Sequence, residues 1–92
     1  MTRSIHKAAY GDLREKLRTL RTKAGLSQRA LATRLGVPHS WVAKVESGER
    51  RLDVVEFTEF AQACGANASK AFEEFAKSAS VPWVGLPRKG RP

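Results

Sequence analysis

The chain has 92 residues, of which 17 are Lys or Arg and nine are Asp or Glu, which gives a formal net charge of +8 at pH 7. A single domain of this length has a modest core and little room for the deep cleft of an enzyme. One cysteine excludes an internal disulfide, and with two histidines it falls short of a structural zinc site unless carboxylates assist. The positive charge predicts an acidic partner, either nucleic acid or an anionic membrane surface.

The sequence also excludes several classes of protein. No apolar run follows the first residues, and no stretch approaches the roughly 18 apolar residues of a membrane span. We therefore expect a cytoplasmic protein. The chain shows no set of nucleophile, base and acid, no cluster of metal ligands and no phosphate-binding Gly loop. We expect no enzymatic activity, no metal and no cofactor.

The charge changes sign along the chain. Residues 1–52 carry twelve basic and four acidic side chains, whereas residues 53–79 carry two and five, and residues 80–92 add three basic ones. The positive field thus belongs mainly to the first half, which predicts that a DNA duplex would face that half.

A first helix is indicated by three leucines that recur at spacings of four and three within residues 13–20. Asp12 with Glu15 fits a capping box that would begin this helix, although an earlier start through residues 8–10 stays open. Gly25 is a suitable end.

Two short helices follow on the basic half. Ser27 is a good N-cap for the second helix, and Gly36 ends it. Pro38 suits the first turn of a third helix because its missing N–H costs nothing there, and Gly48 closes that helix. Two helices joined in this way can place the second of the pair in a major groove.

A fourth helix is expected after Asp53, which forms a capping box with Glu56, and Gly65 ends this helix. Its apolar side carries Phe57, Phe60, Ala61 and Cys64, and we expect the cysteine to be an inert core residue.

A fifth helix is expected from about Ser69, with one apolar stripe made of Phe72, Phe75, Ala76 and Ala79. No β-hairpin signal is present, so the sequence predicts an all-α, five-helix fold. We divide the chain into an N-terminal arm (1–9), a DNA-binding domain (10–79) and a basic and apolar tail (80–92).

The third helix has two distinct faces. Val42 and Val45 mark its buried side. Ser40 and Lys44, four residues apart, stack roughly opposite the valines, with His39 beside them. Small, polar and cationic groups suit base edges, and Lys44 can donate to a guanine or to a phosphate.

The segment from Leu26 to Gly48 resembles the helix-turn-helix of the phage-repressor and Cro-like family, also called the xenobiotic-response-element (XRE) family, which has a five-helix lambda-repressor-like fold. The resemblance covers about residues 10–79. The matching residues are Gly25-Leu26-Ser27-Gln28, Leu31-Ala32, Leu35-Gly36-Val37 and Val45-Glu46-Ser47-Gly48-Glu49-Arg50.

The resemblance implies binding to double-stranded DNA, with bases read from the positions of His39, Ser40 and Lys44. His39 stands where Gln or Thr is common, so no base preference is transferred. A pair between Arg21 and Glu46 is implied as well. The residues implied to contact the DNA backbone are Ser27, Gln28 (which could also reach a base or brace His39), Trp41, Ser47, Arg50 and Arg51.

The leading interpretation is a sequence-specific transcriptional regulator, a dimeric repressor that inserts the third helix into the major groove. A homodimer is expected because one recognition helix reads too few base pairs to select a genomic site. Phe72 and Phe75 are the candidate dimer interface, and ordinary core packing is their alternative. Trp83 could fold back, seal the dimer or bind another protein. A minor-groove arm using Arg3 and Lys7 also stays open.

Two other functions remain open. The apolar tail and the acidic back half are compatible with an antitoxin or accessory interaction module, whose DNA binding would depend on an unidentified protein partner. Non-specific coating of nucleic acid would instead give steep salt dependence with almost no discrimination between sequences.

Overall fold

A computed structural model describes residues 7–78 of the chain. They form α1 (Lys7–Lys23), α2 (Gln28–Leu35), α3 (His39–Ser47), α4 (Val54–Ala63) and α5 (Ala68–Ser78), and there is no strand within this range. The prediction of an all-α, five-helix fold is confirmed.

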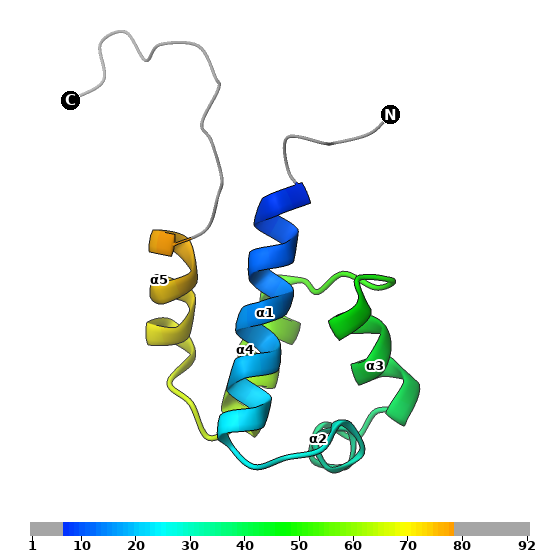
Figure 1. Cartoon of the computed structure of the whole chain (residues 1–92). Helices are drawn as coiled ribbons and strands as arrows, with labels where there is room; N and C mark the ends of the chain where they lie inside the picture. The colour runs from blue at the N-terminus through cyan, green and yellow to red at the C-terminus, as the bar shows by residue number, and fades with distance from the viewer. Residues whose placement is uncertain (1–6, 79–92) are drawn as a thin grey trace, which may run out of the picture.

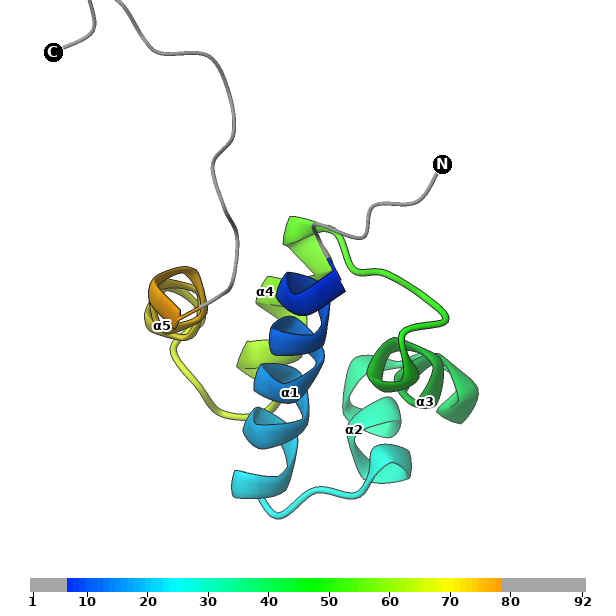
Figure 2. The ribbon, with the colours of Figure 1, turned by 45° about the horizontal axis from the view of Figure 1, so that its top comes forward.

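The helices are arranged around α1 and α4. Figure 1 shows α1 in front of α4, with α5 on one side of the pair and α2 and α3 on the other. The turned view in Figure 2 keeps α5 and α3 on opposite sides. The helix pair α2–α3 packs closely and also contacts α1 and α4. With this packing, one side of α3 faces the core and its outer side faces away from the core.

The core is built from apolar side chains of the first four helices, including the faces that the sequence predicts for the first, third and fourth. Leu17, Leu31, Val42 and Phe60 are its largest fully buried side chains, one from each of α1 to α4. Cys64 is buried beside them, as expected, and burial raises the pKa of its thiol. Removal of these side chains from water supplies the main stabilisation of the domain.

The predicted caps explain where α2 and α4 begin. The Ser27 hydroxyl accepts a hydrogen bond from the Ala30 N–H at 3.0 Å. Asp53 and Glu56 form the complete capping box, in which each side chain accepts from the other residue's N–H. These bonds satisfy backbone donors that a helix start otherwise leaves open.

The start of α1 corrects one prediction. The helix begins at Lys7 and runs through Asp12, so the Asp12–Glu15 capping box is wrong and the earlier start holds. Residues 7–9, which we assigned to the arm, form its first turn. Alanine is the best helix former, and burial of Ala9 extends the packed face of α1 by one turn. Pro38 lies one position before the first turn in which the sequence places it. Its backbone is extended, which makes it the N-cap of α3.

The apolar stripe of α5 is also shifted from its predicted position. Ala71 is its buried residue and Phe75 is half-buried, whereas Ala76 is exposed and Phe72 remains 54% exposed. The small Ala71 is the point at which α5 meets the core, which turns Phe72 outward. Its ring keeps an edge contact with Phe57, with ring centroids 6.1 Å apart. The predictions for Ala79, Arg3, Trp83 and the tail fall outside the described residues.

Candidate nucleic-acid interface

A buried carboxylate, Glu46 near the end of α3, ties three elements together. Glu46 is only 3% exposed. Arg21 of α1 donates to its two oxygens at 2.6 and 2.9 Å, and Gln28 of α2 donates at 3.0 Å. Arg21 also donates to the carbonyl of Leu26 in the turn between α1 and α2. The expected Arg21–Glu46 pair is present, and it fixes how α2 and α3 sit against α1.

The charges of this network are mutually stabilised. Burial by itself would raise the pKa of the Glu46 carboxyl, but hydrogen bonds from Arg21 and Gln28 outweigh it and hold the pKa below its ordinary value. The hydrogen bond to Glu46 raises the pKa of Arg21. A buried pair of this kind orients its elements more than it stabilises them, because desolvation offsets much of the attraction. The network therefore serves to position α3.

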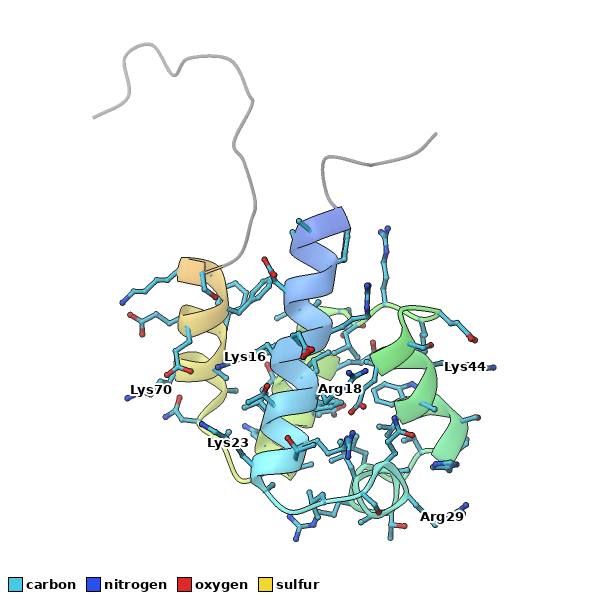
Figure 3. All side chains as sticks on the ribbon, in the orientation of Figure 1. Lys16, Arg18, Lys23, Arg29, Lys44 and Lys70 are labelled. Carbon is cyan, nitrogen blue, oxygen red and sulfur yellow. The ribbon has the colours of Figure 1, made fainter. Side chains whose placement is uncertain are left out.

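The outer face of α3 is free of the core. His39, Ser40 and Lys44 are all exposed, while Val42 and Val45 on the opposite side are buried. Figure 3 shows Lys44 extending away from the rest of the molecule. The two faces predicted for this helix are thus present, and the outer one offers small, polar and cationic groups.

Arg50, which the resemblance implies as a contact to the DNA backbone, is held in place by other residues of the chain. Its guanidinium donates to both oxygens of Glu56 at 3.1 and 3.0 Å and to the Arg51 carbonyl at 2.8 Å. The same group lies over Trp41, 4.9 Å from the ring centroid. The hydrogen bonds from Arg50 hold the pKa of Glu56 below its ordinary range. Trp41 is half-buried against the core, and Arg50 covers part of its ring.

Three other residues implied by the resemblance already have hydrogen-bond partners. The Ser27 hydroxyl caps α2, and the Gln28 amide donates to Glu46 rather than bracing His39. The Ser47 hydroxyl donates to the carbonyl of Lys44 at 3.1 Å. Arg51 is exposed, and its guanidinium carbon lies 4.3 Å from the centroid of the Tyr10 ring.

Several basic residues near α3 were not among the predicted site residues. Arg18 of α1 places its Nε 3.8 Å from a Glu46 oxygen, and Arg29 is exposed on α2. Arg14, Arg18 and Arg21 recur at spacings of four and three, which puts them on one face of α1. That spacing is the sequence signal by which this row could have been found.

Basic side chains occupy both sides of α1. Figure 3 shows Arg18, Arg29 and Lys44 on the side of α2 and α3, and Lys16, Lys23 and Lys70 toward α5. On the α5 side, Lys16 forms an ion pair with Glu74 at 2.6 Å, which holds the pKa of the Glu74 carboxyl below its usual range. On the α3 side, the exposed cations Arg18, Arg29 and Lys44 lie around the helix-turn-helix formed by α2 and α3.

The described part of the chain lacks two other kinds of feature. None of its helices is long and apolar enough to cross a membrane. Residues 7–78 also hold no group of three or more His, Cys, Asp or Glu side chains that could bind a metal ion.

The fold and this surface define a helix-turn-helix domain. The family model described as a helix-turn-helix domain matches residues 12–71. Among solved structures, the chain is similar to an XRE-family like protein from Pseudomonas syringae pv. tomato str. DC3000, with 40% identity and a TM-score of 0.76, over 80% of this chain and 90% of that one. A comparison with curated proteins finds no match. The chain belongs to the XRE-like helix-turn-helix family of DNA-binding domains, whose members are typically regulators rather than enzymes.

Proposed function

We propose that the chain is a sequence-specific regulator of transcription, a dimeric repressor that inserts α3 into the major groove of double-stranded DNA. The observation that carries the proposal is the exposed face of His39, Ser40 and Lys44 on a helix whose other side is anchored by the Glu46 network. An anchored helix with a free polar face is suited to reading base edges.

The dimensions of α3 agree with this role. A helix with its side chains is about 10–12 Å across, which fits the major-groove width of about 12 Å, and the nine residues of α3 span about 13.5 Å along its axis. Lys44 would donate to a guanine, Ser40 would allow close approach, and His39 would donate or accept near the start of the helix. The proposed backbone contacts are those of Ser27, Gln28, Trp41, Ser47, Arg50 and Arg51.

The proposed dimer interface is an apolar groove lined by α1, α4, α5 and the segments that flank α4. It has a volume of about 620 Å³, takes no lining residue from α2 or α3, and includes Leu13, Leu52, Val54, Phe57, Phe72 and Phe75. Val54 and Phe72 are 79% and 54% exposed and line the same groove, and exposed apolar side chains gathered in one patch are typical of interaction sites. A second copy seated there would give a two-fold dimer, with half-sites about one helical turn, roughly 34 Å, apart. Such a dimer would repress by covering a promoter.

The same groove favours a second candidate function. In an antitoxin or accessory module, a different protein would cover Val54 and Phe72, and DNA binding would depend on that protein. The two candidates differ in what the purified chain does alone, because a homodimer needs no other component.

Selection of duplexes from a random DNA pool by the purified chain, at about 150 mM salt, tests the proposal, since this salt level penalises purely electrostatic binding. We expect enrichment of a two-fold repeat with a fixed spacing. Enrichment of a single half-site would support a sequence-specific regulator but would contradict the proposed dimer. Binding at low salt without enrichment would contradict sequence reading and favour non-specific coating.

A further inference from the structure

Arg14 of α1 lies against the end of α3, in a space that a glycine keeps open. A Cβ atom at Gly48 would lie 3.0 Å from Nη1 and 3.2 Å from Cζ of Arg14. On the other side of the guanidinium, a Cβ at Gly11 would lie 3.9 Å from Nη2. The planar group thus fits between the first half of α1 and the turn that follows α3. A Cβ at Gly48 would force the guanidinium to shift by a few tenths of an ångström.

The Arg14 guanidinium has no acidic partner within residues 7–78, unlike the guanidinium groups of Arg18, Arg21 and Arg50. Arg18 and Arg21 face Glu46, and Arg50 binds Glu56. Arg14 is half-buried, yet no buried side-chain nitrogen or oxygen of the described residues is without a hydrogen-bond partner. The unused donors of Arg14 therefore face solvent, where an anion can reach them.

Arg51 offers a second guanidinium at the same junction. It follows Gly48 by three residues and rests on Tyr10, which precedes Arg14 by one helical turn on α1. In Figure 1 the segment from α3 to α4 passes behind α1, and in Figure 2 it reaches the start of α4 near the start of α1. Stacking on an aromatic ring restrains a guanidinium, so less freedom is lost when it binds.

We propose that Arg14 and Arg51 together bind one phosphate of the DNA backbone at the border of the groove that α3 occupies, which extends the interface from the helix-turn-helix onto α1. This inference rests on the proposed DNA-binding function. Guanidinium groups present paired donors that match phosphate oxygens. The carbonyl end of a helix repels an anion, so a phosphate near Gly48 needs cations to offset the α3 dipole. Arg14 and Arg51 are placed there.

The test compares Arg14→Gln, Arg51→Gln and Lys23→Gln by fluorescence anisotropy, with the selected operator and with a random duplex, over a range of salt concentrations. Lys23→Gln is the matched control, because it removes one charge from the other end of α1 (Figure 3). We expect Arg14→Gln and Arg51→Gln each to weaken binding about fivefold on both duplexes and to reduce the salt slope by about one. The control should change neither value appreciably.

A scan with single methylphosphonates, which remove the charge of one phosphate at a time, identifies the contact. One position should weaken the wild-type complex and leave both Arg variants unaffected. The inference is overturned if Arg14→Gln behaves like Lys23→Gln, or if it lowers the melting temperature and leaves the salt slope unchanged, as a purely structural residue would. Loss of sequence preference with a retained Arg14 effect would overturn only the proposed function. A wild-type chain that binds no duplex would overturn both.

Discussion

Glu46 is the residue on which the placement of α3 depends, because its carboxylate receives donors from α1 and α2. We expect Glu46→Ala to lower the free energy of unfolding by about 3 kcal/mol, the lower end of the range for a broken buried pair. The low end applies because the Arg21 side chain is 12% exposed and keeps some contact with water. Urea denaturation measures the loss. Glu49→Ala, at an exposed glutamate three residues on, should change it by less than about 0.5 kcal/mol.

The same carboxylate predicts how stability depends on pH. The pKa of Glu46 in the folded chain lies below its ordinary value of 4.5. A group with a lowered folded pKa contributes stability that is fully present above the unfolded pKa and is lost as pH falls through the folded one. The free energy of unfolding of the wild-type chain should therefore decrease as the pH drops below about 4.5, and that of Glu46→Gln should decrease less steeply. Identical acid profiles in the two proteins would contradict this assignment.

Lys44 should read a base, whereas Arg50 should hold the backbone. If Lys44 donates to a guanine, Lys44→Ala should cost about 1–3 kcal/mol on the selected operator and relax the choice at one base position. Arg50→Ala should weaken binding to all sequences alike. Competition binding against a panel of single-base operator variants measures both effects. An equal loss for Lys44→Ala on operator and random DNA would refute its role in base reading.

At the scale of helices, two structural features favour glycine at position 48, in the turn after α3. Gly48 has a φ of +90°, which costs an L side chain roughly 1–2 kcal/mol, and it also leaves room for Arg14. Gly65 has a φ of +75° with no atom within 4 Å of an added Cβ. We expect Gly48→Ala and Gly65→Ala to destabilise the domain similarly, while only Gly48→Ala weakens DNA binding. Thermal melts and anisotropy together check this, and equal affinities would argue against the Arg14 contact.

Local signals predicted most element boundaries. Ser27, Gly36 and the Asp53–Glu56 box lie where the sequence places them, because caps depend on residues within one turn. The start of α1 does not follow from one local signal, since Asp12 fits a cap whereas the alanines before it favour helix, and the helix begins at Lys7. The stripe of α5 was shifted because Ala71, rather than Phe72, meets the core. Which residue of α5 is buried depends on how the helices pack together, and the spacing of apolar residues along the chain carries no information about that packing.

The candidate site was predictable in outline but not in its connections. The outer face of α3 follows from the spacing of Ser40 and Lys44 opposite the valines. The hydrogen bond from Gln28 to Glu46 joins residues 18 apart, and Arg14 of α1 lies against Gly48 in the turn after α3. Such contacts exist only once the helices have packed, so no local pattern indicates them.

For the whole molecule, the apolar groove predicts a test of self-association. Phe72→Glu should shift the chain to a monomer in sedimentation experiments, because a charge in an apolar interface loses water without gaining a partner. It should also weaken binding to the two-fold operator more than to a half-site. Ala76→Glu is the control, because it puts the same charge on an exposed position of α5 outside the groove. A monomeric wild-type chain at micromolar concentration would contradict the proposed dimer.

In Figure 2, α1 and α4 lie between α3 and α5, so the proposed reading face of α3 and the α5 side of the proposed assembly surface are on opposite sides of this layer. After a gene duplication, substitutions at His39, Ser40 and Lys44 could redirect one copy to a new operator while both copies kept the same assembly surface. Two diverging paralogues would then still form mixed dimers until changes near Phe72 separated them. In this architecture the choice of DNA and the choice of partner are free to evolve at different rates.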